Sequence, residues 1–522
     1  MTGVGVTWSS DSRSVLHPGV RGALLAAAVV LASAITLAAT GNPGYALIPV
    51  AAIGVGYAVW KAPLRWTFVA ALGVFMLGDI APRDAAGDVK FWQPPTHVLR
   101  LFLFENLKSA TSIGILRFSG AELLLVLILV LAMLRFASED PIDRRGRITG
   151  ANVVPIVVAL SLAALLALEG WGIARGGDVR QSLFQFRLLL WFPMLVAAAL
   201  YAFRGPRDAA FLAWAVTIVA CIKVAIGAYF YYGVPRPAGT VLQSVTSHND
   251  SVLFVTVIAV WVAIAVFLPT RGRLVVAAVV CALMLLGMVI NNRRTAFVSL
   301  PAILAVLFVL MPPRMKRKTL LQALYWSPLL AFYVIVGRNR TGAIFAPAAS
   351  FFSAIQQNDP SSASRVAENY NLIYTLRQHP LLGSGWGHEY VEVWKGYDIS
   401  WIFEQYRYIA HNSVLWLWTI GGPIGFTLLW LPLVVGLFLA ARSYYQAQRS
   451  ADRAIAYVAI AIIVAFVLQA WADMGTASWT TMGLLACALA MSSKLATVTG
   501  AWPRGARLVA GRSGRPGLSL SS

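Results

Sequence analysis

Charged residues are scarce in this chain. Only 12% of its 522 residues are charged, whereas 59% are hydrophobic, and a soluble globular domain carries about 25% charged residues. Apolar runs of roughly 17 to 24 residues recur along the sequence, and each could cross the roughly 30 Å hydrocarbon core of a bilayer as a helix. These runs are continuous rather than alternating with period two, which excludes an outer-membrane β-barrel. The composition therefore predicts an all-α, polytopic membrane bundle.

Cysteine is also rare, with Cys221, Cys281 and Cys487 as its complete set. All three fall inside apolar runs, and none forms a CxxC pair. This placement excludes a disulfide framework and a cysteine-based metal site.

The apolar runs predict about 12 to 14 membrane spans. We place them at residues 22–39, 45–60, 66–80, 120–136, 151–169, 185–203, 209–231, 251–268, 273–290, 297–311, 320–336, 411–440, 453–472 and 478–493. The run 411–440 is long for one crossing and contains Gly421, Gly422 and Pro423, so a kink is expected there. The predicted organisation is an N-terminal bundle over 1–336 with an outer loop at 81–119, a loop or cap over 337–410, C-terminal helices over 411–493, and a disordered tail over 494–522.

The net charge of +21 is explained by topology. With the N-terminus in the cytoplasm, the short loops rich in arginine and lysine, such as 144–147 and 314–318, all become cytoplasmic, as the positive-inside rule requires. We therefore expect a cytoplasmic-membrane protein with both termini in the cytoplasm, membrane lipids as its surroundings, and no nucleic-acid partner.

Several arginines fall on the predicted outer side, where the positive-inside rule does not explain them. Arginine keeps its charge and matches phosphate oxygens with a planar fork of donors. The candidates for binding an anionic headgroup include Arg187, Arg236, Arg293, Arg294, Arg338, Arg340, Arg365 and Arg377. Each one could instead snorkel to lipid phosphates or pair with an outer acid.

A second group of polar residues lies between the outer loop and the span that begins near residue 411. Residues 365–377, which include Arg365 and Glu368, predict one amphipathic helix that stops before Pro380. The glycines that follow would allow the backbone to approach a ligand closely. His411 stands where the chain re-enters the membrane, and a histidine there can act as a general base or as a phosphate donor. A structural hydrogen bond is the alternative role for this histidine.

These motifs resemble the signature of the O-antigen ligase and Wzy-type polymerase superfamily. The segment HPLLGSGWG from His379, followed by HNSVLWLWTIGGPIG from His411, resembles that family's glycine turn and its HN-containing helix. Two upstream segments, RPAGT from Arg236 and NRRTA from Asn292, resemble its outer arginine motifs. The chain departs from the pattern at Thr295, where the family has glycine, and at Trp386.

The resemblance implies a membrane glycosyltransferase of GT-C type that uses an undecaprenyl-pyrophosphate-linked glycan as donor and a glycan or lipid core as acceptor. It implies no cofactor and no metal, with the catalytic roles falling to His411 and Arg294. Substrate-binding roles would fall to Arg187, Arg236, Arg293, Arg365 and Glu368. The active site would face the outside of the cytoplasmic membrane.

Two other functions remain open from the sequence. A protein O-oligosaccharyltransferase of the same superfamily would use a Ser or Thr hydroxyl as its acceptor. A flippase or secondary transporter should carry charges near mid-bilayer, and Lys223 is the obvious candidate for such a charge. The sequence equally allows this lysine to neutralise a lipid phosphate or to pair with an acid.

Overall fold

The computed structural model describes most of the chain. The described residues are 18–41, 45–79, 103–104, 106–108, 118–137, 147–233, 245–338, 340, 345, 348–349, 352, 360–396, 398, 400–401 and 403–503. They form helices joined by turns, with one isolated bridge between Asn106 and Ser119.

The long helices follow one another along the chain. They are α1 (Pro18–Thr40), α2 (Ile48–Lys61), α3 (Leu64–Gly78), α6 (Gly120–Ala137), α8 (Val153–Ala174), α9 (Val179–Ala202), α10 (Asp208–Ala228), α11 (Asp250–Phe267), α12 (Arg271–Asn291), α13 (Arg294–Leu310), α14 (Pro313–Gly337), α16 (Pro360–Gln378), α17 (Ser413–Gln446), α18 (Ser450–Ala472) and α19 (Trp479–Thr499). Short helices also occur among the described residues: η1 (Tyr45–Leu47), η3 (Tyr229–Gly233) and η4 (Gly475–Ala477).

Each predicted span coincides with a helix, so the prediction of an all-α membrane bundle is confirmed. Among the described residues, ten helices are long and apolar enough to cross a membrane. Shorter apolar helical stretches are Ala26–Ala38 within α1, Leu64–Gly78 (α3) and Arg294–Leu310 (α13). The amphipathic helix expected over 365–377 is α16, which begins five residues earlier.

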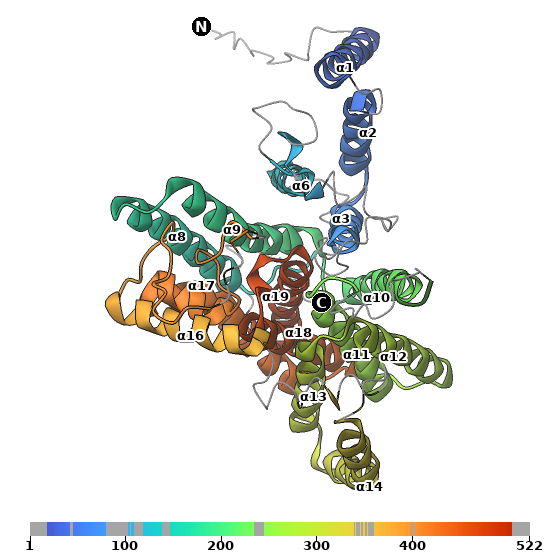
Figure 1. Ribbon diagram of the computed structural model, residues 1–522. Helices are drawn as coiled ribbons and strands as arrows, with labels where there is room; N and C mark the ends of the chain where they lie inside the picture. Colours follow the sequence, from blue (N-terminus) through green and yellow to red (C-terminus); the bar gives the residue numbers. More distant parts are fainter. Residues whose placement is uncertain are drawn as a thin grey trace, which may run out of the picture.

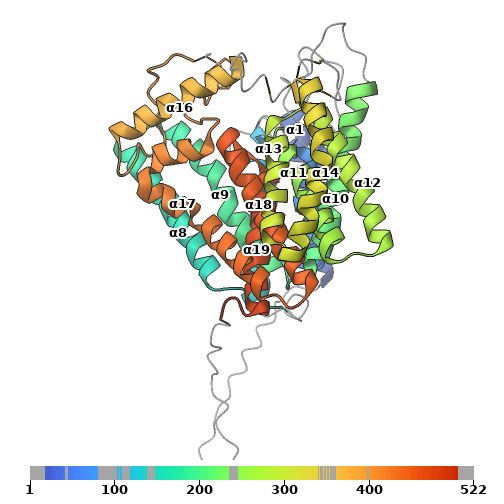
Figure 2. The same ribbon diagram turned by 90° about the horizontal axis from the view of Figure 1, so that it is seen from below.

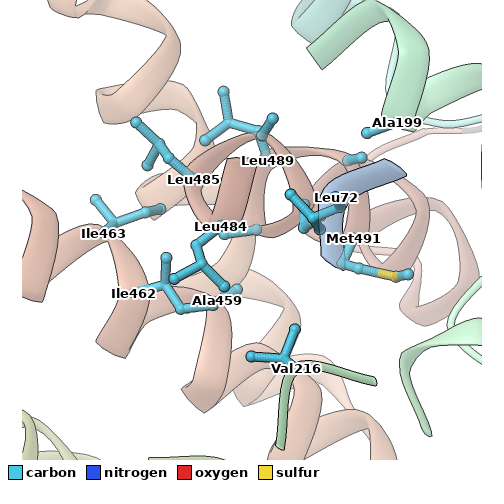
Figure 3. Packing of buried hydrophobic residues seen from close by; sticks show 14 of the residues in the cluster. Leu72, Ala199, Val216, Ala459, Ile462, Ile463, Leu484, Leu485, Leu489 and Met491 are labelled. Atoms are coloured by element: carbon cyan, nitrogen blue, oxygen red, sulfur yellow. The ribbon is translucent and has the colours of Figure 1, made fainter. Parts of the chain in front are cut away.

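Helix α19 forms the centre of the bundle. Nearly all of its side chains are buried, and it packs against α9, α17 and α18. Figure 1 shows α18 and α19 in the middle, with α8, α9 and α17 on one side and α10, α11 and α12 on the other. The core that surrounds α19 is aliphatic, and Figure 3 shows Leu484, Leu485 and Leu489 of α19 beside Ile462 and Ile463 of α18.

The helices have two distinct ends. Helix α16 lies across one end rather than along the other helices, and we call this the α16 end (Figure 2). Helices α11, α13, α17 and α19 begin at the α16 end. The other end, called the opposite end below, holds the turn between α9 and α10 and the turn between α17 and α18.

Two predicted boundaries, the kink in the run 411–440 and the start of the tail, can be compared with the helices. The kink expected in the run 411–440 is present, because Gly422 inside α17 has φ 55° and ψ −171°. The tail expected from residue 494 begins later, because α19 continues to Thr499. Lys494 looked like the exit from the membrane, but it is buried and its Nζ donates to the carbonyl of Ile148 at 3.0 Å. Residues 504–522 of the tail lie outside the described residues, as does most of the predicted outer loop 81–119.

Candidate active site

His411 lies directly before α17, and its side chain meets Glu368 of α16. Nδ1 of His411 is 3.2 Å from Oε1 of Glu368, and the backbone N–H of His411 donates to the same carboxylate at 3.2 Å from each oxygen. The Glu368 side chain is 8% exposed and that of His411 is 31% exposed. Burial lowers the pKa of His411, but the hydrogen bond and the charge of Glu368 raise it, and the net shift is upward.

This contact fixes the tautomer of neutral His411. An ionised carboxylate can only accept hydrogen bonds, so Nδ1 of His411 must carry the proton. Nε2 then has a lone pair, and among the described residues it has no hydrogen-bond partner. The arrangement leaves His411 with a basic nitrogen on a partly exposed ring that Glu368 holds in one orientation.

A second histidine, His248, lies between Asp473 and Arg293. Nδ1 of His248 is 2.8 Å from Oδ2 of Asp473, and its Nε2 contacts Nη2 of Arg293. Since the guanidinium only donates, Nε2 of His248 must accept, and Nδ1 donates to Asp473. Burial raises the pKa of Asp473, but the hydrogen bond from His248 and the nearby positive charges outweigh it and hold that pKa well below its usual range.

Three arginines lie at the same end of the bundle as these two pairs. Burial lowers the pKa of Arg293 to about 10; the charge of Asp473 opposes this shift and that of Arg365 adds to it, and Arg293 remains protonated at neutral pH. The charge of Arg365 also lowers the pKa of His411 and Asp473. Arg294 is the first residue of α13, and its Nη1 donates to Oγ of Ser362 on α16 at 3.0 Å.

The sequence of α16 explains how it presents these groups. Its buried positions, Ala367, Glu368, Asn371, Leu372 and Thr375, recur at intervals of three and four residues, which places them on one face of the helix. Leu372 is fully buried among residues of α17 and of the segment that follows α16. The apolar anchor therefore holds α16 against α17, and Glu368 on the same face reaches His411.

The turn after α12 places the paired arginines. Asn292 ends α12 in the left-handed conformation with φ 45°, which asparagine tolerates better than most residues. The chain therefore reverses at once, and Arg293 and Arg294 follow at the start of α13. A short turn, predicted from Asn291 to Ala296, is thus present at the α16 end, where it comprises only Asn292 and Arg293 because α13 begins at Arg294.

The glycine segment after α16 docks on the kink of α17. Pro423 lacks an N–H, so the carbonyl of Thr419, four residues earlier, has no partner within the helix. The backbone N–H of Ser384 donates to that carbonyl at 3.0 Å, and the N–H of Gly385 donates to the carbonyl of Ile420 at 3.0 Å. Backbone N–H groups of the GSG turn therefore donate to carbonyl groups beside the GGP kink, including the Thr419 carbonyl that has no partner in the helix.

The predicted role of these glycines was wrong in one respect. They allow close approach, but to protein backbone rather than to a ligand. A Cβ on Gly385, which has φ 79°, would lie 2.5 Å from Cα of Gly172 in α8. Trp386, where the chain departs from the family pattern, is fully buried, and its Nε1 donates to the carbonyl of Leu165 at 3.1 Å.

Arg187 lies in a neighbouring cavity. Its Nε pairs with Oε1 of Glu122, which also accepts from Nε1 of Trp191 at 3.1 Å. The cavity has a volume of about 270 Å³ and is lined by Arg187, Trp191, Asp79 and Trp479 among others. Trp191 and Trp479 are stacked with ring centroids 4.2 Å apart.

Buried polar contacts join this cavity to the histidine cluster. Asp79 accepts from the hydroxyls of Ser478 at 2.8 Å and Ser247 at 3.3 Å, and Ser247 directly precedes His248. Lys223 donates to the Asp79 carbonyl at 2.6 Å and pairs with the fully buried Asp250 at 2.5 Å. The lysine that raised the possibility of a transporter therefore has an acid partner, one of the alternatives that the sequence left open.

The structure brings five of the seven predicted site residues together at the α16 end: Arg293, Arg294, Arg365, Glu368 and His411. Arg187 lies in the adjoining cavity. Arg236 lies outside the described residues.

Sequence reasoning missed His248 and Asp473 as members of the cluster. His248 follows the upstream arginine motif at Arg236 and carried no functional prediction, whereas Asp473 is a lone acid after an apolar run and gave no signal of its own. Among the described residues, no group of three or more His, Cys, Asp and Glu side chains is placed to hold a metal ion.

Fold and site together define a polytopic membrane protein with a histidine- and arginine-rich site at one end of the bundle. Residues 279–430 match the protein-family model described as O-antigen ligase. This match includes Arg293, Arg294, α16, the glycine turn and His411, and it confirms the resemblance to the O-antigen ligase and polymerase superfamily. A comparison with curated protein sequences gave no significant match.

Proposed function

We propose that this protein transfers a glycan from a polyprenyl pyrophosphate to a hydroxyl group of an acceptor. The acceptor oxygen attacks the anomeric carbon of the donor sugar as the bond from that carbon to the pyrophosphate oxygen breaks. The polyprenyl pyrophosphate leaves with the electron pair of that bond, and the acceptor proton passes to Nε2 of His411. The family match supports an O-antigen ligase-type membrane enzyme, and the polar cluster supports this particular division of roles.

The observation that carries the donor assignment is the state of Arg293. Its Nε is buried and has no hydrogen-bond partner among the described residues, although Nη2 contacts His248. A buried donor without a partner costs free energy, which an anionic oxygen would recover. Arg294 and Arg365 add two further positive charges beside it. Fixed cations of this kind stabilise the charge that develops on a leaving pyrophosphate.

His411 is suited to accept the acceptor's proton. Its Nε2 bears the lone pair because Glu368 occupies Nδ1, and its ring is partly exposed. Glu368, which the sequence assigned to substrate binding, takes the role of a positioning residue in this proposal. The resemblance also allows His411 to bind phosphate as a cation, and the two roles differ in their pH dependence.

The cavity around Arg187 suits the sugar part of a substrate. Its aromatic walls and its few charged groups are typical of small-molecule sites, which combine apolar surface with a small number of orienting polar atoms. We assign to Arg187 the binding of glycan and retain for Arg236 the predicted role at the pyrophosphate.

We further propose that the α16 end faces the outside of the cytoplasmic membrane. The opposite end carries many arginines, among them Arg65, Arg204, Arg207 and Arg449, and a positive excess favours the cytoplasmic side. A glycan, a lipid core or a protein hydroxyl can each serve as the acceptor, since the ring of His411 is partly exposed.

A transfer assay tests the proposal. Purified protein in vesicles, supplied with an undecaprenyl-pyrophosphate oligosaccharide, should lengthen the glycan or move it to an added lipid core, with release of undecaprenyl pyrophosphate. Arg293→Lys should raise the KM for the donor about 10- to 100-fold, because a charged hydrogen bond contributes about 1.5–3 kcal/mol. The matched control is Arg180→Lys, since Arg180 is 79% exposed and pairs with Glu404. Equal KM values for Arg293→Lys and Arg180→Lys would show that Arg293 does not bind the donor.

A further inference from the structure

A cavity at the opposite end of the bundle is surrounded by arginines from separate segments. Arg65 stands at the start of α3, Arg204 and Arg207 lie between α9 and α10, and Arg449 directly precedes α18. The cavity has a volume of about 570 Å³. Residues far apart in the sequence thus place their positive charges around one space.

The acids in this cavity do not balance its arginines. Asp208 and Asp452 are the two carboxylates among the lining residues, against four arginines. Asp208 is already engaged, since it accepts from Nη1 of Arg65 at 3.1 Å and from the backbone N–H of Arg204 at 2.6 Å. Arg207 and Arg449 are exposed. The four arginines exceed the two carboxylates by two positive charges, and this excess favours an anionic ligand.

An apolar groove continues from this cavity. The groove has a volume of about 380 Å³ and shares Pro206, Arg207, Ala451 and Ile455 with the cavity. It lies between α10, α11, α18 and α19, and its lining is almost entirely apolar. Five of its lining residues, Val216, Ala459, Ile462, Leu484 and Met491, are labelled in Figure 3.

The depth of the groove matches one leaflet of a bilayer. Along α10 the lining extends from Arg207 to Val216, and along α18 from Ala451 to Ile462. At about 1.5 Å per residue these stretches are about 13 to 16 Å long. Half of the roughly 30 Å hydrocarbon core is about 15 Å. The exposed Trp214 shows that the groove opens on the outer surface of the bundle.

We propose that the cavity and the groove together bind one anionic phospholipid. Its phosphate lies among the arginines, with Arg207 and Arg449 as its direct partners, and one acyl chain fills the groove. Basic pockets between transmembrane helices are suited to anionic headgroups. Scattered arginines would satisfy the positive-inside rule without a cavity, and an apolar groove alone would accept any lipid. Because the arginine-lined cavity and the apolar groove are continuous, they favour a lipid whose headgroup carries net negative charge.

Lipid binding to the purified, delipidated protein tests this site. Native mass spectrometry should show one phosphatidylglycerol molecule bound at least tenfold more tightly than phosphatidylcholine with the same chains. The double variant Arg207→Gln/Arg449→Gln should bind phosphatidylglycerol about 25-fold more weakly, since each arginine near an anionic lipid contributes about fivefold. Arg317→Gln, at an exposed position of α14 at the same end, is the control and should bind like the unaltered protein.

A second pair of variants tests the groove. Ala213→Phe narrows it and should weaken phosphatidylglycerol binding, whereas Ala278→Phe, on the exposed side of α12, should not. Gel filtration and thermal unfolding in detergent establish that each variant is folded. Equal binding of the two phospholipids would overturn the proposal. So would binding of glycerol phosphate without chains at the same affinity, or tighter binding of undecaprenyl phosphate than of phosphatidylglycerol, which would assign the site to the carrier lipid.

Discussion

Replacing Glu368 with glutamine removes the negative charge beside His411 and keeps the shape of the side chain. Oε1 of Glu368 lies 3.2 Å from both the backbone nitrogen and Nδ1 of His411. The amide oxygen of glutamine can take the place of Oε1 and accept from both N–H groups, so Nδ1 keeps its proton and Nε2 keeps its lone pair. The imidazolium that forms when Nε2 takes the acceptor's proton then lacks the carboxylate that stabilises it.

The expected loss follows from the charge that is removed. A hydrogen bond to a charged group contributes about 1.5–3 kcal/mol, so Glu368→Gln should lower kcat for glycan transfer about 10- to 100-fold. The KM for the lipid-linked donor should change little, since the arginines remain in place. Glu404→Gln is the control, because Glu404 is 57% exposed and pairs with Arg180 at the surface.

The pH dependence separates the two roles open to His411. As a base, His411 must be neutral, so transfer is lost as the pH falls through the pKa of His411. Burial lowers this pKa, but Glu368 raises it by more, and the net shift is upward. Without the carboxylate that raise is lost, and the residual activity of the variant should fall off at a lower pH than in the unaltered protein. A phosphate-binding cation would instead lose activity as pH rises. An unchanged kcat and pH profile in Glu368→Gln would show that Glu368 does not assist His411 in the transfer.

Three further outcomes are expected. Purified protein should transfer glycan in excess EDTA, because arginines supply the positive charge, and activity restored only by Mg²⁺ or Mn²⁺ would contradict this. Arg294→Lys should remain in membranes but bind the donor about tenfold more weakly, since lysine lacks the planar fork; transfer at the original rate and donor affinity would exclude Arg294 from the clamp. In a variant without the three native cysteines, an impermeant maleimide added to intact cells should label a cysteine at Ser400 and not one at Lys318, and the reverse pattern would invert the topology.

The positions of the helices could be predicted because a membrane span is a local property. A run of about twenty apolar residues specifies a helix whatever its neighbours are. The ends were harder to predict, and Lys494 shows why. A lysine usually marks the end of a span, yet here the Ile148 carbonyl on another segment satisfies its ammonium within the bundle.

The site could be predicted in part. The arginine pair and His411 stood at recognisable turns next to spans, and their convergence with Glu368 requires only that these turns share one end of the bundle. Asp473 could not be found, because its role depends on contact with His248, 225 residues earlier in the chain. The position of the glycine turn was predicted correctly, but its contact with α17 was not. That contact depends on the Thr419 carbonyl, which lacks a helical partner because Pro423 has no N–H.

The proposed chemistry depends most directly on His411. The decisive measurement is the rate of glycan transfer by His411→Ala, made in membranes where the amount of inserted protein is measured in the same sample. We expect insertion close to that of the unaltered protein, because the ring lies before α17 and is partly exposed, and transfer reduced by about 10² to 10⁴. Transfer at the original rate by fully inserted His411→Ala would show that the active site lies elsewhere.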